Sequence, residues 1–432
     1  MSRSEPTPAR RAAYAVVHRV FEEGAYADRA LHGEARELEP RERALAHQLA
    51  FGTVQRARTL DHVIERLARP PQRLDAPTRT ALRLGLFQLL FLDGVAEYAA
   101  VTESVELARA ARSGGHGLVN AVLRRATREG RALVDALPEG TAPEAAVRHS
   151  LPDWIATLWW EAYGPDTARA LMAASNEPAE HALRVNTLVV DRDALAHRLP
   201  VPCHPAPDPE LREGLVIDGP FDAHGSPLWT EGLFMPQSRG AMLVAALLAP
   251  HRGERILDLC AAPGGKTTHL AALMGGEGEV VAVERHAGRA GALERTAARL
   301  RAAPPVQVLV GDAAHDDVGT GYDRVLVDPP CSGLGTLRHR PDVRWRASPE
   351  AARGLVAQQT AILSSGAAAL RPGGTLAYAV CTLNPAEADG PVEALTMQHP
   401  ELELVHRRTV WPHRDATDGF SISLLRHTGR DG

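Results

Sequence analysis

Two cysteines, Cys331 and Cys381, are the residues whose chemistry is most readily interpreted in this sequence. Cys331 follows Asp328-Pro-Pro at the end of one short apolar run, and Cys381 ends another such run. A single cysteine is often a small buried hydrophobe. Two cysteines at the ends of neighbouring strands instead indicate a reactive pair, because a thiolate adds readily to an electron-poor ring carbon. We interpret Cys203 and Cys260 as structural.

A glycine-rich segment, 260–266, lies between an apolar run at 255–259 and a helical pattern at 265–274. In a doubly wound sheet such a turn binds a ligand, because glycines let the backbone approach it and the helix start offers free N–H groups. The segment fits neither the GxGxxG pattern of dinucleotide sites nor the GxxxxGK[ST] pattern of phosphate loops. It also contains Lys266, the only lysine in the sequence.

Three acidic residues follow other apolar runs. Glu284 comes about 20 residues after Gly264, a position that suits a carboxylate bonding a ribose diol. Asp312 could bond an adenine amino group or simply cap its own loop. Asp328 could bond the edge of a planar substrate. All three are expected at the carboxyl edge of one sheet, where ligands bind.

The elements that must position these residues begin at about residue 231. Apolar runs at 255–259, 280–283, 306–310, 324–327 and 375–380 alternate with helical stretches at 265–274, 288–301 and 350–370. This alternation predicts a parallel, doubly wound α/β sheet. Near the end, Asp418-Gly419 precedes alternating residues 420–424, which predicts a closing antiparallel edge strand.

The first part of the chain has a different character. Residues 8–140 show helical periodicity with short breakers and predict a helical bundle with its own core. Residues 151–230 open with a helical pattern, continue with a strand-like run at 182–190 and include a Pro-rich loop at 199–209. We interpret them as a small α+β domain.

The composition is that of a globular chain of two or three domains. The chain has 432 residues, of which 44% are hydrophobic and 23% charged, with a net charge of −5. This excludes a disordered or disulfide-scaffold protein, and no apolar run reaches the roughly 18 residues of a membrane span. The cysteines form no CxxC pair, and we find no secretory signal. We therefore expect a cytoplasmic monomer with free thiols, no metal and no membrane partner.

The motifs together resemble those of the RNA cytosine-5 methyltransferases of the NOL1/NOP2/Sun family. The resemblance rests on Cys260–Thr267, on Asp328–Gly333 and on Cys381 at a strand end. The helical part resembles a NusB-like RNA-binding domain in its segments 82–93, 102–107 and 119–125. Bacterial 16S rRNA cytosine-5 methyltransferases with this architecture are similar from about residue 9 to 427.

The resemblance implies a multidomain fold: an all-α NusB-like bundle at 1–142, a small α+β RNA-binding or connecting domain at 151–230, and a Rossmann-like class I methyltransferase at 231–432. It implies S-adenosylmethionine as cofactor and 16S rRNA as partner. The residues implied to bind the cofactor are Cys260, Ala261, Ala262, Pro263, Gly264, Gly265, Lys266, Glu284, Asp312 and Asp328.

The resemblance also implies roles in catalysis. Cys381 attacks carbon 6 of cytosine, so that carbon 5 can take the methyl group, and Cys331 assists loss of the carbon-5 proton and release of the enzyme. Asp328 lies near cofactor and base, and Lys266 places a positive charge near the thiolate or the base. Because the base must leave its stack, the target is expected to be a single-stranded or loop cytosine.

Other functions remain open at the level of sequence. The RNA could be tRNA or 23S rRNA, and the chain could be a NusB-like RNA-binding or assembly protein with an inactive catalytic domain. A DNA cytosine methyltransferase would use Cys331 as nucleophile and would not need Cys381. Arginines at 124–128, 338–340 and 344–346 are candidates for phosphate binding, with a solvated surface as the alternative.

Overall fold

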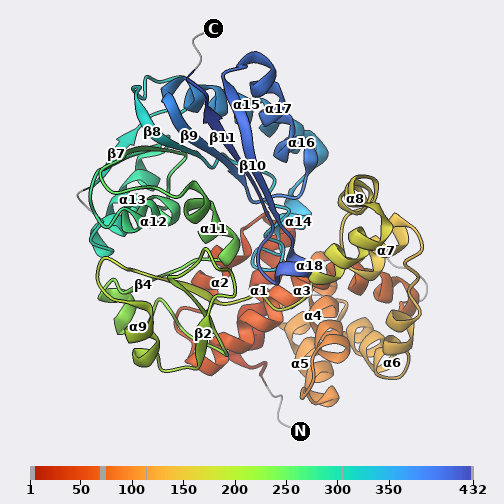
Figure 1. Cartoon of the computed structure of the whole chain (residues 1–432). Helices are drawn as coiled ribbons and strands as arrows, with labels where there is room; N and C mark the ends of the chain where they lie inside the picture. Colours follow the sequence, from red (N-terminus) through yellow and green to blue (C-terminus); the bar gives the residue numbers. More distant parts are fainter. Residues whose placement is uncertain (1–4, 69–73, 113, 303–304, 430–432) are drawn as a thin grey trace. The chain divides into compact units, whose positions relative to one another are not determined.

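The computed structural model describes residues 5–68, 74–112, 114–302 and 305–429 (Figure 1). The chain divides into two compact units, one of residues 1–177 with 337–347 and the other of residues 178–336 with 348–432. Within the described ranges no helix is long and apolar enough to cross a membrane. The same ranges contain no group of three or more histidine, cysteine or acidic side chains that suits a metal ion.

The first unit is helical, as the periodicity predicts. Its helices are α1 (Pro8–Glu22), α2 (Ala27–Glu34), α3 (Pro40–Leu67), α4 (Ala76–Phe91), α5 (Glu97–Ala110), α6 (His116–Asp135), α7 (Ala142–Arg148), α8 (Asp153–Ala174) and the short α14 (Val343–Arg346).

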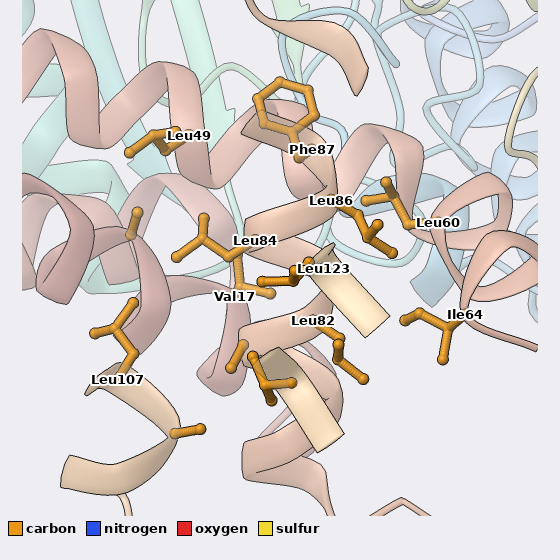
Figure 2. Close-up of a cluster of buried hydrophobic side chains, with 14 of the residues drawn as sticks. Val17, Leu49, Leu60, Ile64, Leu82, Leu84, Leu86, Phe87, Leu107 and Leu123 are labelled. Atoms are coloured by element: carbon orange, nitrogen blue, oxygen red, sulfur yellow. The ribbon is translucent and has the colours of Figure 1, made fainter. Parts of the chain in front are cut away.

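Helix α4 is the centre of this unit. It begins at a Pro-containing first turn whose N-cap, Asp75, accepts a hydrogen bond from the backbone N–H of Thr78. Leu82, Leu84 and Leu86 are all fully buried, so the helix has no solvent face along most of its length. Figure 2 shows these leucines among side chains from the surrounding helices.

The second unit contains two sheets. The smaller is antiparallel, in the order β2-β3-β1-β4, and the larger has seven strands in the order β10-β11-β9-β8-β5-β6-β7. The strands are β1 (Ala182–Val185), β2 (Cys203–Pro205), β3 (Gly214–Ile217), β4 (Phe234–Pro236), β5 (Arg255–Leu259), β6 (Glu279–Glu284), β7 (Val306–Val310), β8 (Tyr322–Val327), β9 (Leu370–Val380), β10 (Leu402–Val410) and β11 (Phe420–His427). The helices are α9 (Arg192–Arg198), α10 (Pro227–Thr230), α11 (Arg239–Leu248), α12 (Gly265–Leu273), α13 (Ala287–Arg299), α15 (Pro349–Ala369), α16 (Pro385–Ala388), α17 (Gly390–Gln398) and α18 (Pro412–Asp415).

Both faces of the larger sheet are buried at its central strands, as the near-continuous apolar runs predict. Ile256 packs with Leu270 in one core cluster, whereas Leu257 and Leu259 pack with Leu363 in another. Strands β5 to β9 pair in parallel, and β11 pairs antiparallel with β9 and β10. The predicted α/β sheet is therefore present, and the carboxyl ends of its parallel strands meet at one edge.

Three predictions about elements need correction. The strand predicted at 182–190 ends at Val185, because residues 187–189 form a turn. In this turn the side-chain oxygen of Asn186 accepts the N–H of Leu188, and its carbonyl accepts the N–H of Val190. The Pro-rich loop contains strand β2, which pairs with β3. The closing strand β11 is antiparallel but lies inside the sheet, and the edge is β10.

Candidate active site

The two cysteines that the sequence singles out face each other across neighbouring strand ends. Cys331 follows β8 and Cys381 follows β9, and these strands are adjacent and parallel. The two sulfur atoms lie 3.3 Å apart, and both side chains are partly exposed. The sheet thus brings two thiols that are 50 residues apart in the chain into hydrogen-bond distance.

Lys266 lies at the same edge of the sheet. Its ammonium Nζ is 2.6 Å from Oδ2 of Asp328, and it sits 5.3 Å from the centre of the Phe420 ring. Burial lowers the pKa of Lys266, but the charge of Asp328 and its hydrogen bond outweigh this effect, so the pKa is raised above its ordinary value. Lys266 is therefore a fixed positive charge at the site.

The charges around the two sulfurs differ. The hydrogen bond with Cys331 lowers the pKa of Cys381. Burial and the negative charge of Asp328 oppose this effect, and the Lys266 ammonium adds to it. The same hydrogen bond raises the pKa of Cys331, together with burial and the negative charges of Cys381 and Glu387. With its pKa lowered while that of Cys331 is raised, Cys381 is the more readily ionised thiol of the pair.

The glycine-rich turn leads from β5 into α12. Gly264 has a φ of +99°, and a Cβ atom there would lie 2.4 Å from Cδ1 of Leu293, so only glycine fits. The N–H of Ala261 bonds to the carbonyl of Val283 at 3.0 Å. Below the turn, the fully buried Asp258 accepts a 2.6 Å hydrogen bond from the Thr267 hydroxyl, and burial raises the pKa of Asp258 to about 7.

The acidic residues at the next two strand ends lie along the same edge. Glu284, at the end of β6, is buried; its Oε1 accepts the N–H of His286 at 2.9 Å, and Arg289 lies 3.5 Å from its other oxygen. Asp312 follows β7, where Oδ1 accepts the N–H of Ala314 at 3.1 Å and Oδ2 lies 3.5 Å from Arg285. Asp312 thus caps its own loop and keeps one oxygen for an ion pair.

Three features of the site are not singled out by the sequence reasoning. Gly335 joins two loops: its N–H bonds to the carbonyl of Cys381 at 3.0 Å, and its own carbonyl accepts the N–H of Gly419 at 2.8 Å. Arg184, fully buried, supports the glycine-rich turn by donating to the carbonyl of Gly265 and, at 2.8 Å, to the Thr268 hydroxyl.

The third feature is Glu387, which lies beyond Cys381 and is completely buried. It accepts hydrogen bonds from residues next to both cysteines. Its place in the sequence, three residues after Asn384, is typical of a helix-capping pair and gives no reason to connect it with the cysteines.

Arg344, proposed from the sequence as a phosphate-binding candidate, has a structural role instead. It is fully buried, and its guanidinium donates to the carbonyls of Gln55, Ser150, Ser175 and Leu337 and to Oδ1 of Asn176, all in the helical unit. Because the side chain is fully buried and both terminal nitrogens donate within the helical unit, Arg344 is not available to bind RNA phosphate.

The site and fold match known proteins. Residues 245–426 match the family model described as 16S rRNA methyltransferase RsmB/F, residues 7–128 match the NusB family, and residues 151–224 match the ferredoxin-like domain of RsmF/B-like methyltransferases. The chain is 34% identical over 97% of its length to a probable ribosomal RNA small subunit methyltransferase B of Synechocystis, covering 99% of that protein. It is 32% identical to ribosomal RNA small subunit methyltransferase B of Vibrio cholerae, with 96% of both chains covered.

A solved structure agrees with the fold. The crystal structure of PH0851 superimposes with a TM-score of 0.78 at 25% identity, covering 98% of this chain and 99% of that one. The predicted succession of a NusB-like helical part, a small α+β part and a Rossmann-like methyltransferase is confirmed, and so is the resemblance inferred from the motifs. The chain belongs to the 16S rRNA methyltransferase RsmB/F family.

Proposed function

We propose that this methyltransferase transfers a methyl group from S-adenosylmethionine to carbon 5 of a cytosine in 16S rRNA, through a covalent bond between Cys381 and the base. The observation that carries the mechanism is the pair of sulfurs 3.3 Å apart in unequal electrostatic surroundings. The substrate class is supported by the relatives, which are named small subunit rRNA methyltransferase B.

The residues at the sheet edge fit S-adenosylmethionine. Glycines at 264 and 265 place no side chain on the turn, so the backbone can approach a ligand, and the first N–H groups of α12 suit its carboxylate. Glu284 offers a buried carboxylate for the ribose, and Asp312 follows at the next strand for the adenine. We assign residues 260–266 to the methionine part, with Asp328 between cofactor and base.

The reaction then follows from the charges of the site. The Cys381 thiolate forms a bond to carbon 6, and the displaced electron pair makes carbon 5 nucleophilic. S-adenosylmethionine supplies a methyl group on a positively charged sulfur, which carbon 5 accepts. The Asp328–Lys266 pair holds charge beside the reacting ring.

Cys331 completes the cycle. Once Cys381 is bonded to carbon, it no longer accepts the hydrogen bond that kept the proton on Cys331, so Cys331 can release that proton to water. Its thiolate then takes the proton from carbon 5, and the electrons of the carbon–sulfur bond return to Cys381. The products are 5-methylcytosine, the demethylated cofactor and the original thiol–thiolate pair, with one proton released.

The test is to map 5-methylcytosine at single-nucleotide resolution after incubation with S-adenosylmethionine and an unmodified 16S transcript. We expect one modified cytosine, absent with Cys381→Ala and unchanged with Cys203→Ala, whose side chain lies in the small antiparallel sheet. Cys331→Ala should accumulate a protein–RNA adduct.

Each alternative gives a different result in the same experiment. Methylation of tRNA or 23S rRNA but not of 16S rRNA would support the proposed reaction and refute 16S rRNA as its substrate. RNA binding without methylation of any RNA would refute the enzyme and favour a NusB-like binding protein.

A further inference from the structure

Glu387 is a buried carboxylate whose oxygens are bonded by the loops that carry the two cysteines. Its side chain is fully inaccessible. Oε1 accepts the backbone N–H of Ser332 at 2.8 Å and the Gln359 side-chain amide at 3.1 Å. Oε2 accepts the Ser332 hydroxyl and, at 3.0 Å, the Asn384 amide. These donors are neutral, so the hydrogen bonds stabilise the charge without cancelling it.

The contacts of Glu387 reach both cysteines through their neighbours in the chain. Ser332 follows Cys331 directly, and Thr382 follows Cys381. The two hydroxyls of Ser332 and Thr382 lie 2.8 Å apart, and the Thr382 hydroxyl is 3.5 Å from Oε2 of Glu387. Gln359 extends the network on the other side of Cys331, because its amide also bonds to the carbonyl of Pro330 at 2.9 Å.

The network therefore holds the backbone immediately before and after Cys331, and the side chain of the residue immediately after Cys381. A side chain on a loop is located only as well as its supporting contacts allow. The sulfur–sulfur distance of 3.3 Å depends on two loops from different strands, and Glu387 is the group bonded to both.

The charge of Glu387 also distinguishes the two sulfurs. Asp328 disfavours the thiolate at both sulfurs, but Glu387 adds its negative charge at Cys331 alone, whereas Lys266 adds a positive charge at Cys381 alone. The anion on one side and the cation on the other both leave the proton on Cys331.

We propose that Glu387 is a positioning residue that holds the two cysteine loops in register, so that Cys381 reacts in preference to Cys331. The proposal concerns the state of the thiols before any RNA binds. Its consequence for methylation rests on the function proposed above.

The test measures the thiols directly in the full-length protein without RNA. Alkylation of each cysteine by iodoacetamide is followed by mass spectrometry between pH 5 and 10. In the unmodified protein Cys381 should react first, with a midpoint below the usual cysteine pKa of about 8.5. In Glu387→Gln, which loses the charge and one acceptor, the ratio of Cys381 to Cys331 alkylation at pH 7 should fall at least tenfold.

Two further variants separate the effect of the Glu387 charge from the effect of its hydrogen bonds to the cysteine loops. Glu387→Asp retains the charge but shortens the side chain, so it should restore part of the selectivity. Ser332→Ala leaves the carboxylate in place and removes only the hydroxyl link, so it should lower the ratio about threefold even if Glu387→Gln does not fold. Glu350→Gln, an exposed carboxylate on α15, is the matched control and should behave like the unmodified protein.

The outcomes distinguish this proposal from the proposed function. An unchanged alkylation ratio in folded Glu387→Gln, or in Ser332→Ala where Glu387→Gln is unfolded, would overturn the role of Glu387, whatever the methylation assay shows. A loss of selectivity with no RNA methylation by the unmodified protein would support the positioning role and refute the function. With both intact, Glu387→Gln should lower kcat and leave the KM for RNA unchanged.

Discussion

Lys266 supplies a positive charge beside Asp328 and the Cys381 thiol. It is the only lysine in the sequence, and its ammonium contacts Asp328 while favouring the Cys381 thiolate. An ammonium is a compact point charge, whereas a guanidinium is broad and planar. The requirement for that compact charge gives a physical reason for a lysine in a chain whose other basic side chains are arginines.

Replacing Lys266 by Met should raise the pH midpoint of Cys381 alkylation, because the lost positive charge no longer stabilises the thiolate. The sign follows from the titration: a thiol with a lowered pKa reacts at lower pH, and removing the cause moves the reaction to higher pH. Lys266→Arg retains the charge and should shift the midpoint much less. An identical midpoint in Lys266→Met and the unmodified protein would show that the hydrogen bond from Cys331 alone lowers the pKa.

The site residues that could be predicted from the sequence are the chemically distinctive ones. The cysteines, the glycine turn and the acids at strand ends stand out by type and spacing, and the structure places them along one edge of the sheet. Their individual roles stay predictions. Glu387 could not be connected with Cys331 from sequence, because its partners Ser332 and Gln359 come from separate segments that only the tertiary fold brings together.

Among the secondary-structure elements, strands were predictable where a short run of apolar, β-branched residues marks them. The runs at 255–259 and 306–310 coincide with β5 and β7. Strand β10 was missed because residues 403–408 are exposed on both faces and show no alternation of apolar side chains. Without it, β11 had only one visible partner and was assigned to the edge of the sheet.

The loop after β8 packs closely against the loop that contains Gly419. A Cβ atom on Gly335 would lie 2.1 Å from the carbonyl oxygen of Gly419, so Gly335→Ala must separate two loops of the site. Overpacking of this kind costs about 1–3 kcal/mol. We expect a melting temperature lower by several degrees and methylation reduced at least tenfold.

The control for that experiment is Gly354→Ala on α15, where no atom lies within 4 Å of the added carbon. Helix propensity predicts a neutral or slightly stabilising effect there. Full activity and stability in Gly335→Ala would mean that the loops move apart at no cost, and would contradict the role of Gly335 in joining them.

At the scale of the whole molecule, the chain leaves the methyltransferase unit after Thr336 and returns at Ser348. The intervening residues complete the helical unit. Arg344 donates to backbone carbonyls there, and the Trp345 indole packs on the core of the bundle and donates to the carbonyl of Val54 at 2.8 Å. The sequence showed only a basic cluster with a tryptophan, a composition that an RNA-binding surface shares.

Arg344→Met should destabilise the helical unit, because several buried carbonyls lose their donor at once. We expect the free energy of opening of α3 and α8 to fall by at least about 3 kcal/mol, measured by hydrogen exchange in the full-length protein. Arg353→Met, at an exposed position on α15, is the control and should change neither helix. Unchanged protection in Arg344→Met would mean that the bundle does not depend on this segment.

In the proposed reaction Cys381 becomes bonded to the cytosine ring and Cys331 does not. This can be observed by incubating Cys331→Ala with S-adenosylmethionine and 16S RNA, digesting protein and RNA, and locating the adduct by mass spectrometry. We expect a methylated cytosine nucleotide bonded to the sulfur of Cys381. An adduct on another residue, or 5-methylcytosine produced at the normal rate by Cys381→Ala, would contradict it.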